Sequence, residues 1–231
     1  MPIITPTLQR SRYRVTAVFI FIFLFITTIN TASAAMADIT PGNPQGWVFA
    51  LESGSNGSGQ FVTGPGVPPA GSGSAQLVVT AGDTGSGLGL PAYGGVRLAD
   101  IEAMSYWTYR TSGSSAQALA LQFTVDLDVT VDDLYDSIDQ GRLVYEPYYN
   151  GSPTTGVWQQ WDAINSGSAR WWATWPASAL TGCPMSNPCT LTTLLTSFPN
   201  AGIRASYPGI GFKAGSGWAS FDGNVDAFSI T

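Results

Sequence analysis

The sequence predicts an all-β protein: an antiparallel jelly-roll β-sandwich with long Gly/Ser-rich loops and one or two short helices. Apolar and polar residues alternate over residues 119–131, a period that gives a strand one buried and one solvated face. Clusters of Gly, Pro, Ser and Asn separate many short segments of this kind. Almost no stretch has the period of an amphipathic helix, so the pattern favours two packed sheets.

The chain opens with a segment, residues 1–34, that we interpret as a secretory signal peptide. Three arginines precede an apolar stretch over residues 15–29, and small residues follow it, which is the order of an export signal. Ala-x-Ala patterns place cleavage after Ala34 or after Ala37. An uncleaved anchor is the alternative, although the apolar stretch is shorter than the ~20 residues that span a bilayer. We therefore expect a secreted, extracellular protein, with no membrane contact after cleavage and residues 38–231 as a single β-sandwich domain.

Charge and composition exclude several classes of function. The chain has 9 basic and 15 acidic residues and no His, and the leader takes three of the basic residues with it. Six basic residues against fifteen acidic ones leave a net charge of −9 without a basic cluster, which excludes nucleic acid as a partner. Without His there is no Ser-His-Asp or Cys-His mechanism and no imidazole ligand for a metal. We expect a monomer.

Strand-like segments follow one another through the mature chain. We expect strands over residues 47–52, 75–80, 103–111, 119–131, 141–149, 156–162, 170–175, 209–214 and 226–230, with short helices over 132–139 and 191–197. The Gly/Ser-rich stretches between residues 53 and 89 are expected to be long loops or an open rim within the same domain.

The two cysteines, Cys183 and Cys189, flank a short turn that contains Pro and Asn. In an exported protein this spacing predicts a local disulfide, which stabilises a loop rather than the whole fold. A metal site is the alternative, which the absence of His disfavours.

Five of the eight tryptophans fall within 18 residues, just downstream of a pair of tyrosines. Because side chains alternate along a strand, one sheet face cannot bury all five indole rings. Exposed rings beside polar groups are typical of a surface that binds carbohydrate or another extracellular component. The alternative is a structural surface protein without a ligand, whose tryptophans are all core residues. The predicted ligand-binding residues are Trp158, Trp161, Trp171, Trp172, Trp175, Tyr148, Tyr149, Gln160 and Asp162.

Carboxylates at Asp126, Asp128 and Asp132 space their oxygens as a Ca²⁺-binding loop does. Val131 and Ser137 stand where the helix–loop–helix calcium pattern has Gly and Glu. The segment is therefore interpreted as a solvated strand end, with Ca²⁺ binding as the alternative.

Both ends of the mature chain resemble a known class of module. The opening Gly46-Trp-Val-Phe-Ala-Leu-Glu52, the later stretch 71–79 (GSGSAQLVV) and the closing Phe221-Asp-Gly-Asn-Val-Asp-Ala-Phe-Ser-Ile230 are similar to strands of galactose-binding-like jelly-roll modules in secreted carbohydrate-active proteins. The central stretch 141–162 resembles uncharacterised secreted bacterial proteins. The first resemblance implies a carbohydrate-binding module without catalysis. It also implies a structural Ca²⁺ that joins the first and last strands through Glu52 with Asp222 or Asp226.

Glu146 lies in a Tyr-Glu-Pro-Tyr-Tyr stretch that resembles the nucleophile strand of small jelly-roll xylanases. Glycoside hydrolysis without His requires two carboxyl groups on either side of the scissile bond. Those enzymes carry their acid/base glutamate near the C-terminus, whereas this chain has no Glu after Glu146, so Asp162 or Asp222 would have to replace it. Binding without catalysis is the leading hypothesis, and a glycoside hydrolase is the alternative.

Overall fold

The computed structural model describes residues 42–51, 56–82, 85–131, 139–205 and 209–231, all within one compact unit that covers residues 33–231. A second unit covers residues 1–32 and lies outside the described residues, as does the whole of the expected leader, residues 1–34. The helix expected over residues 132–139 also falls there, except for its last residue.

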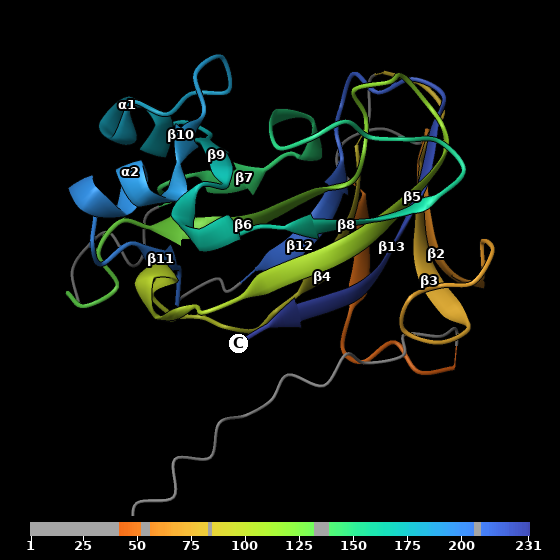
Figure 1. The fold of residues 1–231 in the computed structure, drawn as a ribbon, viewed down its shortest axis with the longest axis horizontal. Coiled ribbons are helices and arrows are strands. Elements are labelled where there is room, and N and C mark those ends of the chain that lie inside the picture. Colours follow the sequence, from red (N-terminus) through yellow and green to blue (C-terminus); the bar gives the residue numbers. More distant parts are fainter. Residues whose placement is uncertain (1–41, 52–55, 83–84, 132–138, 206–208) are drawn as a thin grey trace, which may run out of the picture. The chain divides into compact units, whose positions relative to one another are not determined.

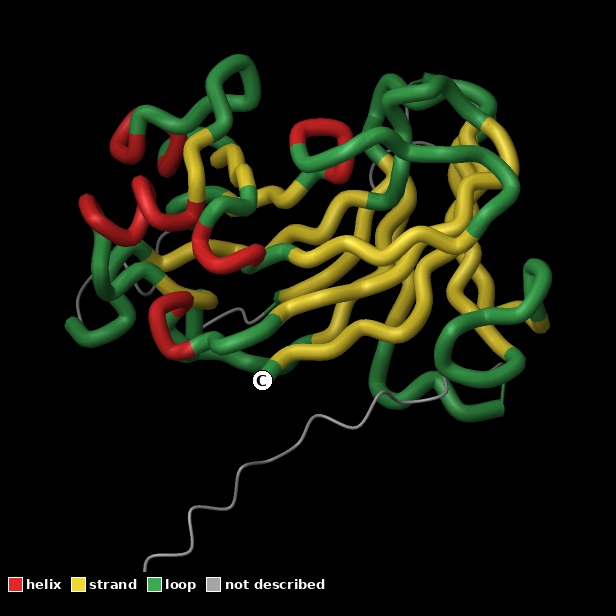
Figure 2. The backbone as a smooth tube through the Cα atoms, viewed as in Figure 1, coloured by secondary structure: helices red, strands yellow, loops and turns green. Residues whose placement is uncertain are grey.

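Two antiparallel sheets form a β-sandwich, which confirms the predicted class (Figures 1 and 2). The larger sheet has the strand order β1-β4-β12-β6-β7-β9-β10, with β11 also paired to β6, and the smaller sheet has the order β2-β3-β13-β5-β8. The strands of the larger sheet are β1 (Val48–Leu51), β4 (Ser86–Leu90), β6 (Ala120–Asp126), β7 (Arg142–Tyr145), β9 (Arg170–Ala173), β10 (Cys189–Thr190), β11 (Gly202–Ile203) and β12 (Ile210–Ala214). Those of the smaller sheet are β2 (Gly57–Thr63), β3 (Gly73–Val79), β5 (Met104–Ser112), β8 (Trp158–Asp162) and β13 (Phe221–Ile230).

Two short α-helices, α1 (Ala177–Thr181) and α2 (Leu191–Ser197), lie with β10 at the same end of the sandwich (Figure 1). The sequence predicts α2 but not α1. Helix α2 begins where the Thr190 hydroxyl accepts a hydrogen bond from the Thr193 backbone N–H at 3.1 Å. Single 3-10 turns occur at η1 (Leu98–Asp100), η3 (Pro147–Tyr149) and η4 (Asn165–Gly167). In the described part of the chain, no helix has the length and apolar character needed to cross a membrane.

The structure corrects the expected loops between residues 53 and 89, because β2 and β4 form there. Strand β4 has the sequence Ser-Gly-Leu-Gly-Leu and is paired on both sides, with β1 and with β12. Cross-strand hydrogen bonds need only the backbone, so pairing overrides the low strand propensity of glycine. Strand β6 is shorter than expected, because the Asp126 carboxylate accepts a hydrogen bond from the Asp128 N–H at 2.9 Å and turns the chain there. Strand β13, in contrast, begins five residues before the expected position.

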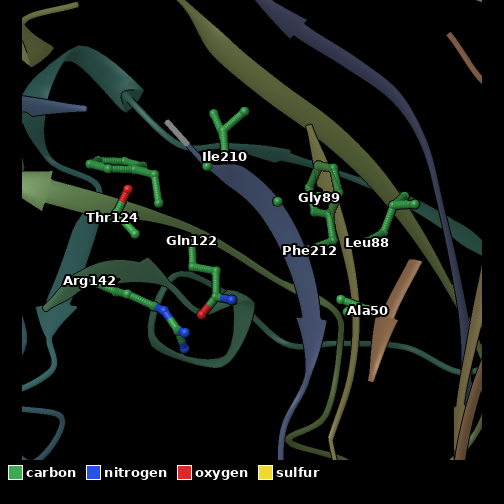
Figure 3. A pocket seen from close by; sticks show the side chains of 12 residues that line it. Ala50, Leu88, Gly89, Gln122, Thr124, Arg142, Ile210 and Phe212 are labelled. Atoms are coloured by element: carbon green, nitrogen blue, oxygen red, sulfur yellow. The ribbon is translucent and has the colours of Figure 1, made fainter. Parts of the chain in front are cut away.

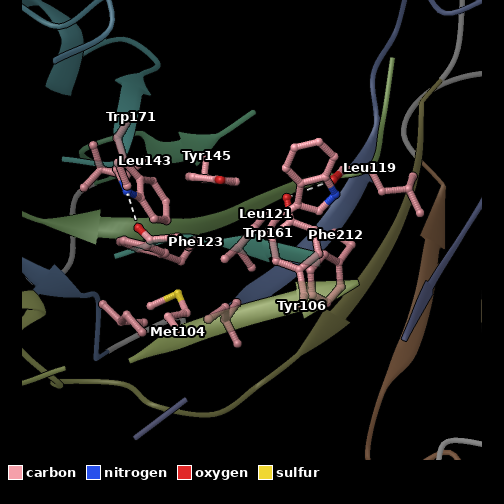
Figure 4. Packing of buried hydrophobic residues seen from close by; sticks show 14 of the residues in the cluster. Met104, Tyr106, Leu119, Leu121, Phe123, Leu143, Tyr145, Trp161, Trp171 and Phe212 are labelled. Carbon is pink, nitrogen blue, oxygen red and sulfur yellow. Dashed lines mark hydrogen bonds between the residues drawn. The ribbon is translucent and has the colours of Figure 1, made fainter. Parts of the chain in front are cut away.

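The core fills the space between the sheets with the inward side chains of each strand (Figure 4). Tyr106 of the smaller sheet packs against Phe212 and Tyr145 of the larger one, with ring centroids 5.0 and 6.0 Å apart. Trp171 packs against Phe123 at 5.4 Å. The polar atoms that these rings bury are satisfied: the Tyr106 hydroxyl donates to the Leu119 carbonyl at 3.1 Å.

The predicted disulfide between Cys183 and Cys189 is confirmed. The Cys183 carbonyl also accepts a hydrogen bond from the Ala173 N–H at 2.8 Å, and Cys189 pairs with Trp171 across β10 and β9. The disulfide therefore holds the short edge strand β10 and its loop against β9.

Arg110, at the end of β5, is a buried cation that organises the loops at that end of the smaller sheet. Its Nη1 donates to the carbonyls of Ser114 and Gln117 at 2.5 and 2.8 Å, and its Nη2 donates to the Pro153 carbonyl at 3.1 Å. Its Nε donates to the Thr155 hydroxyl at 2.9 Å. One planar guanidinium thus joins two loops that are distant in sequence, which a point-like ammonium cannot do.

Arg110→Lys should lower the free energy of unfolding by about 2–4 kcal/mol, because buried carbonyls lose their donors. Arg170→Lys is the matched control, since the Arg170 side chain is exposed and donates to the Pro188 carbonyl at 3.2 Å. Urea unfolding of the two variants measures the difference. Equal shifts in the two variants would contradict this account of Arg110.

Candidate ligand-binding groove

The outer face of the larger sheet is hollowed along its middle, and we call this surface the sheet groove. Two adjoining hollows, of about 210 and 260 Å³, share the side chains of Gln122 and Arg142 and therefore belong to one depression. The first hollow, the glycine end, has Gly87, Gly89 and Gly211 in its lining. The second, the aromatic end, is lined among others by Glu146, Trp172, Met185, Lys213 and Trp218.

Strand register explains why these residues share a face. Six residues, one from each of six adjacent strands, form a row in which each residue is the cross-strand partner of the next. Cross-strand partners project to the same side of a sheet. The row that runs across six strands is Val48, Gly89, Gly211, Gln122, Val144 and Trp172.

Glycines leave the floor of the glycine end without side chains. A Cβ built on Gly89 would meet no atom within 4 Å, and one built on Gly87 would make only ordinary contacts from 3.5 Å. Gly211 differs, since a Cβ there would collide with the Leu88 carbonyl oxygen. Packing therefore requires only Gly211, while Gly87 and Gly89 leave open space that a ligand can approach.

The aromatic end combines indole rings with a half-buried acid. Trp172 is half-buried, and its Nε1–H donates to the Glu146 Oε2 at 3.2 Å. Trp218 packs against Phe221, with ring centroids 4.9 Å apart. The Tyr149 hydroxyl donates to the Met185 carbonyl at 2.9 Å and so fixes the disulfide loop beside the groove.

The environment of Glu146 favours its neutral form. Burial raises the pKa of the Glu146 carboxyl above its usual range, and the hydrogen bond from Trp172 lowers that pKa by less.

Hydrogen-bonding and charged groups line the region where the two hollows meet. Gln122 is on β6, with Arg142 on the neighbouring strand β7 and Lys213 on β12 at the other side. Figure 3 shows the Gln122 amide and the Arg142 guanidinium extending toward one another at the surface of the sheet.

Of the nine predicted ligand-binding residues, Trp172 lines the sheet groove. The structure corrects the expectation for two others: Trp161 and Trp171 are only 6% and 1% exposed and lie in the core. Their indole N–H groups donate inward, to the Thr108 hydroxyl at 2.7 Å and to the Ala163 carbonyl at 2.9 Å. Alternation along β9 sends Trp171 inward and its neighbour Trp172 outward.

The remaining predicted residues are not part of the groove lining. Trp158, Gln160 and Asp162 belong to β8, the edge strand of the smaller sheet. The Trp158 indole donates to the Pro65 carbonyl at 2.9 Å, and the Asp162 carboxylate accepts from two N–H groups of the turn that follows. Tyr148 lies in η3 and is exposed, and Trp175 follows β9 and is 78% exposed.

The three predicted catalytic carboxyls are likewise not brought together in the groove. Glu146 lines the larger sheet's groove, whereas Asp162 and Asp222 belong to strands of the smaller sheet. Asp222 accepts a hydrogen bond from the Gln76 amide at 2.8 Å. Among the described residues that line the groove, Glu146 is the only carboxylic acid, so a two-carboxyl mechanism has no second group there.

The carboxylates predicted to bind Ca²⁺ make hydrogen bonds within the fold. Asp126 accepts from the Gln140 amide at 3.1 Å, and Asp128 accepts from the Thr130 hydroxyl at 2.6 Å and the Asn200 amide at 3.2 Å. The buried Asp226 accepts from a backbone N–H, that of Ala70, at 2.9 Å. Glu52 and Asp132 lie outside the described residues. Within the described ranges, no group of three or more acidic or Cys side chains is placed to hold a metal ion.

Several groove residues were not predicted as site residues: Gln122, Arg142, Lys213, Trp218 and the two floor glycines. Two signals in the sequence mark part of this set. The alternation over residues 119–131 places Gln122 on the polar face of its strand, and Gly87 and Gly89 alternate with leucines. No local pattern indicates that β12 lies between β4 and β6, which is what brings Lys213 to the same surface.

Trp171→Ala and Trp172→Ala should differ sharply in stability although the residues are neighbours. The first removes a core ring and should cost about 3–5 kcal/mol, whereas the second removes a half-buried surface ring and should cost about 1 kcal/mol. Guanidinium unfolding measures both. A greater loss for Trp172→Ala would contradict the assigned faces of β9.

Glu146→Gln should leave the protein as stable at pH 7 as the native protein, or more stable. At pH values above its folded pKa, a carboxyl whose pKa is raised by folding lowers the free energy of unfolding. This loss of stability disappears as the pH falls through the window between the folded and unfolded pKa values. The difference between variant and native protein should therefore shrink on acidification.

Denaturant midpoints at a series of pH values measure this difference, with Glu102→Gln as the control at an exposed acid. A variant that is less stable at pH 7 and regains the deficit in acid would contradict the account of Glu146.

No protein-family model matches the chain, and no curated protein matches it. Among solved structures, it is similar to the family 11 carbohydrate-binding module of the cellulosomal cellulase Lic26A-Cel5E of Clostridium thermocellum (15% identity, TM-score 0.45, covering 80% of this chain and 86% of that one). It is also similar to the solution structure of CtCBM11 (15% identity, TM-score 0.47, covering 87% of this chain and 96% of that one). A third similar structure is the K1 cleaved adhesin domain of Lys-gingipain from Porphyromonas gingivalis W83 (11% identity, TM-score 0.39, covering 81% of this chain and 91% of that one). All three TM-scores are below 0.5, so the likeness is one of β-sandwich architecture, and any function has to follow from the groove itself.

Proposed function

We propose that this protein is a secreted, non-catalytic binding protein whose sheet groove holds a carbohydrate chain. The observation that carries the proposal is the combination of a bare glycine floor with an indole ring and polar side chains on one sheet face. Apolar walls with a few placed polar groups are what ligand sites require.

The residues of the groove match the two surfaces of a sugar ring. The C–H faces of a pyranose pack on an indole such as Trp172, whereas its hydroxyls need hydrogen-bond partners of the kind that Gln122 and Glu146 supply. The open floor at Gly87 and Gly89 lets a ring approach the backbone closely.

The length of the row favours an oligomeric ligand. Six strands contribute to it, and at the usual ~4.8 Å between strands the row extends for roughly 24 Å. A linear chain of several sugar units fits such a surface better than a single small molecule does.

A purely structural protein is the competing proposal, and the floor glycines argue against it. Gly87 and Gly89 weaken a strand, since glycine loses more conformational entropy on folding and packs no side chain. Steric packing does not require either of them. A ligand that needs the open floor accounts for both residues.

The disulfide and the predicted leader support secretion. A structural disulfide persists in oxidising compartments, and Cys183–Cys189 is such a bond. The order of charged, apolar and small residues in the first 34 positions is that of an export signal.

Gly89→Leu should abolish binding while the fold survives, because the new side chain fills the open floor. We expect the dissociation constant to rise at least tenfold, which corresponds to a loss of about 1.4 kcal/mol of binding free energy. Gly42→Leu is the matched control, since that glycine also has no atom near its Cβ position and lies outside the groove lining.

Calorimetric titration with a panel of soluble neutral and acidic polysaccharides measures the effect. If no polysaccharide in the panel binds, or if Gly89→Leu binds as the native protein does, the groove is not a carbohydrate site.

A further inference from the structure

The distribution of basic side chains is uneven in this acidic protein. After the leader, the sequence has six basic residues against fifteen acidic ones. Four of the six, Arg97, Arg110, Arg170 and Arg204, lie outside the groove lining. The other two, Arg142 and Lys213, both line the sheet groove.

These two cations lie on opposite sides of β6. Lys213 is paired with Ala120 and Arg142 with Thr124, so the two are separated by two strand spacings and by four residues along the strands. Ordinary strand dimensions place their Cα atoms roughly 16 Å apart, diagonally across the groove. Charges at that separation suit a chain that carries an anionic group on more than one of its units.

We infer that the sheet groove is selective for uronic acid-containing glycans, with Arg142 and Lys213 as the residues that recognise their carboxylates. This inference rests on the proposed carbohydrate-binding function. The planar guanidinium of Arg142 matches a carboxylate with two parallel hydrogen bonds, and the Lys213 ammonium supplies a second point charge. A neutral glycan needs neither cation.

The net negative charge of the chain does not oppose this selectivity at contact distance. Interactions between exposed charges are screened beyond about 8 Å at physiological ionic strength, whereas a direct ion pair in a partly desolvated groove is screened much less. Glu146 is the single acid in the described lining, and it accepts a hydrogen bond from Trp172.

The test compares each uronic acid ligand with its own neutral counterpart. Oligogalacturonate and alginate oligosaccharides are titrated calorimetrically, each beside a sample whose carboxyl groups have been chemically reduced to alcohols. At least one acidic ligand should bind with an affinity that is higher than that of its reduced form by about tenfold or more, as expected for a charge-assisted pair.

Arg142→Gln should remove most of that tenfold preference, and Lys213→Gln should act in the same direction. Arg97→Gln is the matched control, because it removes the same charge outside the groove. Circular dichroism confirms that each variant is folded.

The outcomes separate this inference from the proposed function. A neutral glycan that binds, loses binding in Gly89→Leu and is preferred to every uronate overturns the inference and leaves carbohydrate binding intact. Arg142-dependent binding of dextran sulfate, which carries sulfates and no uronic acid, without binding of either uronate overturns the carboxylate assignment. No binding of any glycan overturns both proposals.

Discussion

Alternation of side chains along the central strands of the larger sheet is the constraint on which the rest of the structure depends. Each of β6, β7, β9 and β12 sends one residue into the core and the next into the sheet groove. Trp171 and Trp172 show this most clearly, since one packs against Phe123 and the other lines the groove. The sheet groove is therefore held in place by the core packing directly beneath it.

Features away from the groove keep this arrangement rigid. Arg110 joins two loops of the smaller sheet, and the disulfide holds β10 against β9. Within the groove, in contrast, the protein accepts local costs. Floor glycines weaken a strand, and the half-buried Glu146 lies where desolvation disfavours its charged form. Stability lost at a site and maintained elsewhere is the usual sign of a functional surface.

Much of the architecture follows from local pattern, while the assembly of the site does not. The strand around Phe123, the disulfide and helix α2 are all predictable from residue order. Strands β2 and β4 are not, because their glycine-rich sequences acquire strand structure only through pairing with neighbours. The dense cluster of tryptophans indicates a binding surface, yet the structure distributes these rings among the core, two sheet faces and an exposed turn, and brings Trp172 to the groove.

By itself, the sequence determined the fold class, the alternation of buried and exposed positions, the disulfide and the scarcity of charge. These properties depend on residues close together in the chain. Only the tertiary structure decided which outward positions meet, because strand order in a sheet is set by long-range pairing that local patterns do not encode. Lys213, Gln122 and Arg142 are up to 91 positions apart in the sequence, and they share a surface because β12, β6 and β7 are neighbours in one sheet.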